Sequence, residues 1–136
     1  MSRVLVVMGS ESDLPVMQKA VDILTEAGVD VQVAVTSAHR DPEKTTRMAR
    51  EAKDEGFDVV ICGAGLSAAL PGVVASQTVL PVIGVPVSAG TLGGLDALLS
   101  MAQMPSGVPV ATVGINNSAN AAHLALRILG RTAPAA

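Results

Sequence analysis

The side chains best suited to chemistry in this sequence lie at residues 37–42, which read Ser-Ala-His-Arg-Asp-Pro. They follow an apolar run at residues 29–35 and precede a proline, a favoured residue in the first turn of a helix. His39 and Arg40 are therefore expected at the carboxyl end of a strand, where open α/β sheets bind ligands. An imidazole exchanges protons near neutral pH, so His39 is the leading candidate for a general acid or base. A solvated loop histidine is the alternative.

A second loop follows an expected strand at residues 3–8 and reads Gly-Ser-Glu-Ser-Asp at residues 9–13. A glycine and two hydroxyls at a helix N-terminus suit an anion, because free N–H groups point outward along the helix dipole. The spacing matches neither the Walker phosphate loop nor the dinucleotide-binding fingerprint. Helix capping by Ser10 or Ser12 explains the motif equally well. Asp13 suits a sugar hydroxyl or a ring amine better than a phosphate.

A third loop, Gly-Ala-Gly-Leu-Ser at residues 63–67, follows the expected strand at residues 58–62. Ala68 stands where a nucleotide fingerprint would need its third glycine, so the loop is interpreted as an apolar floor that lets the backbone approach a flat ligand. Cys62 is interpreted as a buried structural thiol and His123 as an interface or surface histidine. No His, Cys and carboxylate cluster has metal-ligand spacing, so no metal is expected.

Length and composition narrow the class of protein. A chain of 136 residues suits one domain, and a net charge of −3 with a single aromatic residue argues against a nucleic-acid partner. One cysteine fits a reducing compartment. The residues before the first strand are too few for a signal peptide, and no apolar stretch reaches the length of a membrane span. A soluble cytoplasmic protein is expected.

Apolar runs alternate with helix-like segments along the whole chain. Continuous Val/Ile runs indicate strands buried on both faces, and this alternation predicts a parallel sheet between two helix layers. The expected fold is a three-layer α/β/α sandwich of flavodoxin-like or Rossmann-like type, forming a single domain over residues 1–130 with a loose tail at 131–136. The expected strands are 3–8, 29–35, 58–62, 81–85 and 108–113, and the expected helices are 13–27, 42–55, 67–77, 93–101 and 117–129.

Charge is distributed unevenly. Residues 1–58 hold seven Lys/Arg and eleven Asp/Glu, whereas residues 59–126 hold one charged residue, Asp96. Small uncharged helix faces, such as Asn-Ala-Ala-His-Leu-Ala-Leu at residues 120–126, suit close subunit packing. The sequence therefore predicts a homo-oligomer, with Ala122 on a contact face.

Several motifs occur together in a fixed order. They are Met-Gly-Ser-Glu-Ser-Asp at 8–13, Ser-Ala-His-Arg at 37–40, Gly-Ala-Gly at 63–65, Leu-Pro-Gly at 70–72, Gly-Val-Pro-Val at 84–87 and Gln-Met-Pro at 103–105. Jointly they resemble the PurE family, 5-(carboxyamino)imidazole ribonucleotide mutase of purine biosynthesis, and the resemblance covers residues 3–130. It implies an α/β/α octamer that moves a carboxylate from the exocyclic nitrogen to the ring carbon of an imidazole ribonucleotide, without metal, biotin or nucleotide.

The same resemblance assigns roles to individual residues. By position, His39 matches the general acid/base of the family, and Ser10, Asp13 and Arg40 match its substrate-binding residues. Further substrate contacts are expected from the three loops, at Gly9, Ser12, Ser37, Gly63, Ala64, Gly65 and Leu70.

The chain departs from the family pattern in two places. The mutase branch usually carries a histidine just before Leu-Pro-Gly, where this chain has Ala69, and the branch that carboxylates aminoimidazole ribonucleotide with free CO2 tends to have alanine there. Members also commonly continue into a charged C-terminal helix. Direct carboxylation at the same site is therefore the alternative reaction. A non-catalytic flavodoxin-like nucleotide-binding module is a remote alternative, because Phe57 is the only aromatic residue available to stack on a ring.

Overall fold

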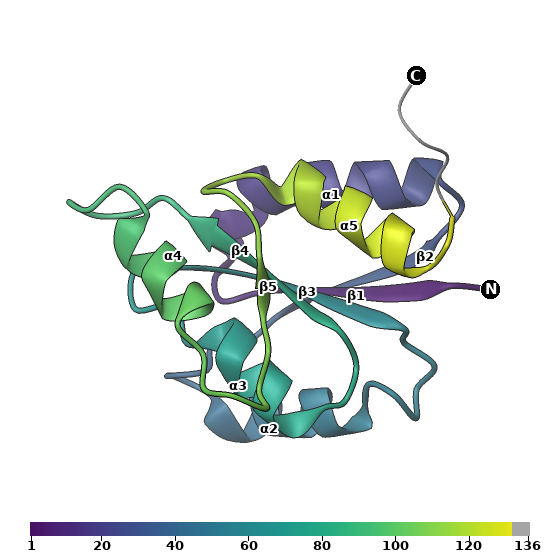
Figure 1. The fold of residues 1–136 in the computed structure, drawn as a ribbon, viewed down its shortest axis with the longest axis horizontal. Coiled ribbons are helices and arrows are strands. Elements are labelled where there is room, and N and C mark those ends of the chain that lie inside the picture. The colour runs from purple at the N-terminus through teal and green to yellow at the C-terminus, as the bar shows by residue number, and fades with distance from the viewer. Residues whose placement is uncertain (132–136) are drawn as a thin grey trace.

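The computed structural model describes residues 1–131 and contains one parallel sheet of five strands (Figure 1). The strand order is β2-β1-β3-β4-β5, so the chain starts near the middle of the sheet and proceeds first to one edge and then to the other. The strands are β1 (Arg3–Met8), β2 (Asp30–Val35), β3 (Val59–Gly65), β4 (Val82–Val87) and β5 (Ala111–Thr112).

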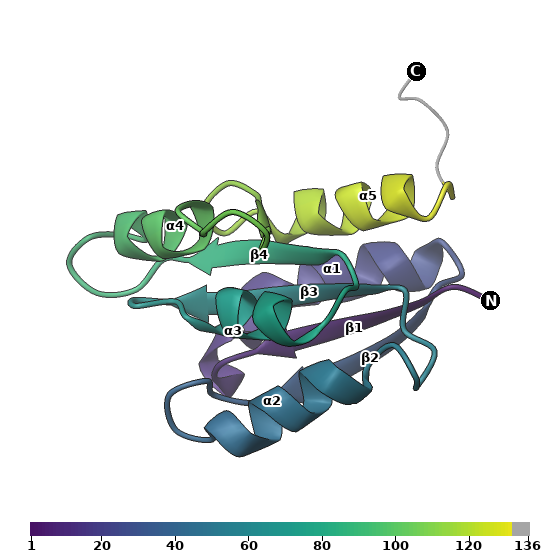
Figure 2. The ribbon, with the colours of Figure 1, turned by 60° about the horizontal axis from the view of Figure 1, so that its bottom comes forward.

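Helices cover both faces of the sheet and make the expected three-layer α/β/α sandwich (Figure 2). One face is covered by α1 and α5, and the other by α2, α3 and α4. A short 3-10 helix, Glu11–Asp13, leads into α1. The α-helices are α1 (Leu14–Glu26), α2 (Pro42–Glu51), α3 (Leu70–Gln77), α4 (Leu95–Ala102) and α5 (Ser118–Ile128).

The central strands are apolar throughout because they serve two cores. In β1, Val4 and Val6 pack with α1 and α5, while Leu5 and Val7 pack on the opposite face with α2, α3 and α4. Successive side chains of a strand point to opposite faces, so a strand between two helix layers needs apolar residues at every position. The continuous Val/Ile runs in the sequence reflect this arrangement.

Several elements differ from the sequence expectations, among them α2, which ends at Glu51 rather than at residue 55. β2 is an edge strand and is largely exposed, with Val33 at 43%, so the prediction that every strand is buried on both faces is wrong for it. β5, at the other edge, pairs over only two residues. β3 continues to Gly65, and α3 begins only at Leu70. The late start follows from Pro71, because a proline fits the first turn of a helix but not its interior.

The alanine-rich face of α5 is already covered within one subunit. Ala121, Ala122 and Ala125 are fully buried in the core formed with α1 and the sheet. The prediction that Ala122 lies on a subunit contact is therefore wrong. Exposed leucines occur instead on and just before α4, at Leu92, Leu95 and Leu99.

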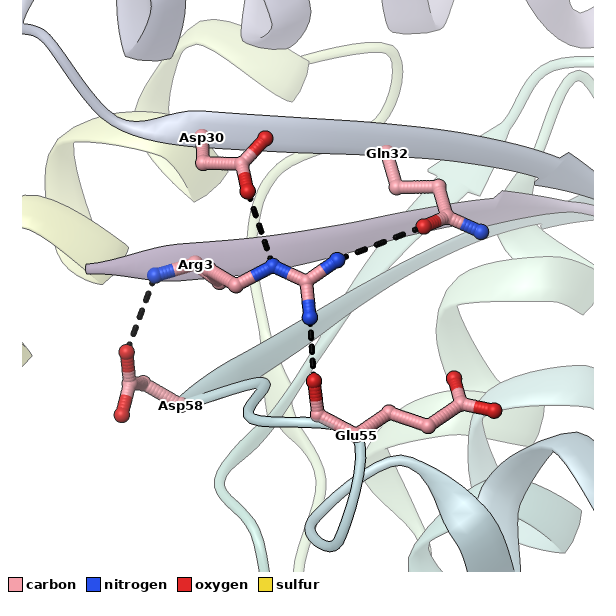
Figure 3. A network of polar contacts seen from close by, with 5 residues as sticks. All are labelled: Arg3, Asp30, Gln32, Glu55 and Asp58. Atoms are coloured by element: carbon pink, nitrogen blue, oxygen red, sulfur yellow. Dashed lines mark hydrogen bonds and ion pairs between the residues drawn. The ribbon is translucent and has the colours of Figure 1, made fainter. Parts of the chain in front are cut away.

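Arg3 holds together the amino ends of the sheet (Figure 3). Its guanidinium pairs with Asp30 of β2 at 2.8 Å, donates to the Glu55 carbonyl, and lies 4.2 Å from the centre of the Phe57 ring. Its backbone N–H donates to the Asp58 carboxylate at 2.9 Å. One side chain therefore connects β1, β2 and the segment between α2 and β3, at the sheet edge remote from the loops that follow the strands.

The C-terminal boundary differs partly from expectation. Arg131, expected in a loose tail, donates its N–H to the Leu126 carbonyl at 2.9 Å and its guanidinium to the Ala27 carbonyl at 2.8 Å. Residues 132–136 of the expected tail lie outside the described residues. Within residues 1–131, no helix combines the length and the apolarity needed to cross a lipid bilayer.

Candidate active site

The register of the sheet aligns the carboxyl ends of its strands, so the loops that follow them begin next to one another. Met8 of β1 pairs with Val35 of β2 and with Gly63 of β3, and Gly63 pairs with Val85 of β4. The strand order reverses between β1 and β3, which is the point where open α/β sheets form their ligand crevices. The segments that follow β1, β2, β3 and β4 therefore converge at one edge.

A cavity of about 420 Å³ lies where these segments meet. It is lined by ten of the eleven residues expected from sequence, and these are Gly9, Ser10, Ser12, Asp13, Ser37, His39, Arg40, Ala64, Gly65 and Leu70. Depressions of about 520 and 580 Å³ elsewhere lie on the outer side of α2 and beside the first residues of the chain, and neither lies at the carboxyl ends of the strands. The cavity at the sheet edge is thus the candidate site.

The loop after β1 supplies hydroxyls and a carboxylate. Ser10 is extended and caps the short 3-10 helix, because its Oγ accepts the Ser12 N–H at 3.2 Å and lies 2.9 Å from the Ser12 hydroxyl. Ser10 therefore caps this short 3-10 helix, whereas α1 itself has no side-chain cap, and both serine residues line the cavity. The carbonyl of Ser10 accepts the Asp13 N–H at 3.0 Å, which continues the turn into α1.

Asp13 is half-buried at the start of α1. Burial raises the pKa of its carboxyl above the ordinary value of 3.8, and a hydrogen bond from the Ser10 backbone opposes this effect. The raised pKa shows that removal from water dominates. A ligand that donates an N–H or O–H to this carboxylate would replace the lost hydration.

The loop after β2 presents His39 and Arg40 on a tight turn. The Asp41 N–H donates to the Ser37 carbonyl at 2.8 Å, and the Arg40 N–H donates to the Ser37 hydroxyl at 3.1 Å. Asp41 then caps α2 by accepting the Lys44 N–H, as its position before Pro42 predicts. Both functional side chains are exposed at the cavity, which leaves them free to contact a ligand.

The glycine-rich end of β3 and the loop after it form an apolar wall. Gly65, the last residue of β3, pairs with Val87 of β4. A Cβ added at Gly65 would lie 3.0 Å from the Val87 carbonyl oxygen and 3.2 Å from the Ala89 Cβ, so glycine allows the end of β3 to approach Val87 and the segment after β4. The next residue, Leu66, has a φ of 55° and is exposed. A bulky residue rarely adopts this left-handed conformation, which costs on the order of 1–3 kcal/mol and is concentrated at functional sites.

Gly63 differs from the other expected site residues, because it does not line the cavity. Its carbonyl accepts the Gly9 N–H at 3.1 Å, and the space that a side chain would need is filled by the Met17 thioether of α1. Gly63 therefore connects β3 to the loop after β1 and lets α1 approach the sheet.

Six cavity-lining residues were not among the expected site residues. Five of them neighbour expected site residues in the loops after β2 and β3, and Ala89 follows β4 at the same sheet edge, which is the signal that could have identified it. The six are Ala38, Leu66, Ser67, Ala68, Ala69 and Ala89.

The remaining candidates lie outside the cavity. Cys62 is fully buried, and burial raises the pKa of its thiol far above the ordinary range, which agrees with a structural thiol rather than a nucleophile. His123 is exposed on α5 beside Arg127, as expected for a surface histidine. Among residues 1–131, no group of three or more His, Cys, Asp or Glu side chains is arranged to hold a metal ion.

The burial of Asp13 predicts that this residue lowers the stability of the empty protein at neutral pH. Its folded-state pKa is raised, so its contribution to stability is greatest below about pH 3.8 and is lost as the pH rises through the folded-state pKa. Asp13→Asn should therefore raise the melting temperature at neutral pH, and the difference from wild type should disappear in acid. Thermal unfolding in phosphate-free buffer checks this, with exposed Asp54→Asn as the matched control. A lower melting temperature for Asp13→Asn at neutral pH would contradict it.

Comparison with known proteins shows the family to which the chain belongs. The family described as AIR carboxylase matches residues 3–136. N5-carboxyaminoimidazole ribonucleotide mutase from Pyrococcus horikoshii is 58% identical over 92% of this chain and 71% of that protein. Chloroplastic phosphoribosylaminoimidazole carboxylase from Vigna aconitifolia is 56% identical over 91% of this chain, which spans 22% of that longer protein.

A solved structure has the same fold. The crystal structure of Treponema denticola PurE superposes with a TM-score of 0.83 at 32% identity, over 96% of this chain and 81% of that one. The expected resemblance is thus confirmed by sequence and by structure, and the chain belongs to the AIR carboxylase family.

Proposed function

We propose that this protein is an N5-carboxyaminoimidazole ribonucleotide mutase of purine biosynthesis. The observation that carries the proposal is the convergence, in one cavity, of the His39–Arg40 turn with the Ser10–Asp13 loop. The family relationship and the mutase relatives support it. In the proposed reaction the carboxylate leaves the exocyclic nitrogen and bonds to the ring carbon, so a C–N bond breaks and a C–C bond forms.

In this proposal the residues that line the cavity have different roles. Arg40 and Ser10 would hold the phosphate, because a guanidinium donates two parallel hydrogen bonds to it and Ser10 adds a hydroxyl. The Asp13 carboxylate would accept a hydrogen bond from the ring amine or from a sugar hydroxyl. His39 would remove the proton left on the ring carbon and return it to the exocyclic nitrogen, which restores the aromatic ring. Leu66, Ala68 and Leu70 would keep water from the reacting carboxylate.

We propose that the protein acts in the cytoplasm and without a cofactor. Its one cysteine is free and buried, which suits a reducing compartment. The proposed chemistry needs a proton carrier and a phosphate anchor, and His39 and Arg40, which both line the cavity, are suited to these roles.

The role of His39 is tested by replacing it with asparagine. A correctly placed base typically contributes 10²–10⁴-fold, so His39→Asn should lose at least about 100-fold in kcat. The exposed position of His39 lets the variant fold, which circular dichroism verifies. His123→Asn is the matched control, because it removes the other imidazole outside the cavity and should keep wild-type turnover. Near-normal kcat in His39→Asn would assign the base elsewhere.

A second candidate reaction is direct carboxylation of aminoimidazole ribonucleotide by CO2. Ala69 favours it, because this small residue lines the cavity where the mutase branch is expected to have a histidine. Supplying the purified protein with each substrate in turn separates the two reactions. We expect the protein to turn over the carbamate substrate, N5-carboxyaminoimidazole ribonucleotide, and to show little turnover of aminoimidazole ribonucleotide plus bicarbonate. The reverse result would contradict the mutase function and support the carboxylase function instead.

We further propose that the protein forms a homo-oligomer, with an octamer as the form that its family resemblance implies. The support is the row of leucines along α4 and the segment before it: Leu92, Leu95 and Leu99 are 60%, 48% and 50% exposed. Leu95 and Leu99 are four residues apart and therefore share one side of α4, while Leu92 lies in the turn that precedes the helix. Contact with another subunit would remove this apolar surface from water.

Oligomer formation should therefore depend on α4 rather than on α5. Leu99→Glu should shift the sedimentation profile toward the 13.7 kDa monomer, because an unpaired carboxylate would be desolvated at the contact. Val33→Glu, which places the same charge on the exposed edge strand β2, should keep the wild-type assembly. A wild-type monomer at micromolar concentration would refute the oligomer.

A further inference from the structure

The side chains of His39 and Arg40 are not held in place by polar contacts with the rest of the protein described in residues 1–131. Within residues 1–131, neither the imidazole nor the guanidinium forms a hydrogen bond or ion pair with another protein group. Their directions therefore depend on the backbone path of the turn, residues 37–41. Whatever fixes that path also fixes where the two groups point in the cavity.

Two buried threonines connect the ends of this turn. Thr36, the residue before it, donates its N–H to the Met8 carbonyl at 3.0 Å and so extends the pairing of β2 with β1. Thr45 lies in α2 just after the turn, and its hydroxyl donates to the Asp41 carbonyl at 3.0 Å. The Thr36 and Thr45 hydroxyl oxygens are 2.9 Å apart.

The direction of these hydrogen bonds follows from the number of protons. A carbonyl only accepts, so the single hydroxyl proton of Thr45 is used on Asp41. Thr36 must therefore donate to Thr45, and the hydroxyls form a one-way relay from β2 through α2 to the end of the turn. Thr36 is 3% exposed and Thr45 is 0% exposed, so water does not compete for these groups.

We propose that Thr36 and Thr45 are positioning residues, whose hydroxyl relay sets the path of the turn and thereby the placement of His39 and Arg40. The inference rests on the function proposed above. Two apolar side chains of the same shape would fill the same volume, so packing alone does not require hydroxyls here. The Asp41 carbonyl also accepts the Thr45 backbone N–H at 3.2 Å, so the hydroxyl adds a second restraint on how that peptide group is oriented.

Three variants test the relay. Thr45→Val keeps the shape, breaks both hydroxyl contacts and leaves Thr36 as a buried donor without a partner. The double variant Thr36→Val/Thr45→Val removes that unsatisfied donor, and replacing both partners by apolar groups can be nearly neutral for stability. Thr45→Ser keeps the hydroxyl. Thr46→Val is the matched control, since it makes the same change at the next position of α2, outside the relay.

If the relay positions the turn, the double variant should lose activity while it keeps a thermal stability close to that of wild type. A displacement of about 1 Å can cost on the order of 100-fold in rate, so kcat/KM should fall roughly 10- to 100-fold in Thr45→Val and in the double variant. The fall should appear in kcat through His39 and in KM through Arg40, although the double variant melts close to wild type. Thr45→Ser and Thr46→Val should remain close to wild type in both constants.

Hydrogen exchange gives a readout that does not depend on the substrate. The amides of Arg40 and Asp41 should exchange faster in Thr45→Val and in the double variant than in wild type, whereas their exchange rates should be unchanged in Thr46→Val. Mass spectrometry of the peptide spanning residues 36–45 follows this exchange. Unchanged exchange in the double variant, or wild-type kcat and KM in it, would overturn the relay. Failure of the wild type to turn over either substrate would overturn the proposed function, while the exchange experiment would still decide the role of the threonines.

Discussion

Burial of the central strands on both faces is the constraint on which the site depends. β1, β3 and β4 send alternate side chains into two separate cores, so a slip of one residue would exchange every inward-facing pair between them. The register is therefore strongly specified, and it keeps Met8, Val35 and Gly63 level. The loops that follow begin from the same edge of the sheet, and the cavity forms where they meet.

Two helices pack closely against the sheet because each places a methionine beside a glycine of a strand. Met17 of α1 fills the space beside Gly63, and Met101 of α4 does the same beside Gly84, where an added Cβ would lie 2.9 Å from the sulfur. A flexible thioether adapts to the irregular gap that a missing side chain leaves. The helices α1 and α4 can thus approach β3 and β4 closely, on opposite faces of the sheet.

The cavity itself is less favourable for stability than the core that supports it. Asp13 is partly removed from water without a cationic partner among residues 1–131, and Leu66 adopts a left-handed backbone conformation with its side chain exposed. Such departures are typical of sites that a ligand completes. The surrounding structure compensates for them through hydrogen bonds at the turns, such as those of Ser10 and Ser37.

The sequence by itself determined the parallel α/β class, the position of each central strand and the loops that contain His39, Arg40, Ser10 and Asp13. These features were predictable because strand burial, helix capping and glycine stops leave local patterns, and because the motifs occur in a recognisable order. Asp41 illustrates this, since it caps α2 directly before Pro42.

Only the tertiary structure decided which partner covers each surface. The alanines of α5 have the composition of a subunit contact, yet they pack on α1, because composition shows that a face is apolar and not what lies against it. Gly63 was expected at the ligand and instead accommodates Met17, while Ala89 enters the cavity from the segment after β4. The contact of Thr36 with Thr45 likewise depends on how α2 is set against β2. Contacts between segments distant in the sequence leave no local pattern, so they become visible only when the chain is folded.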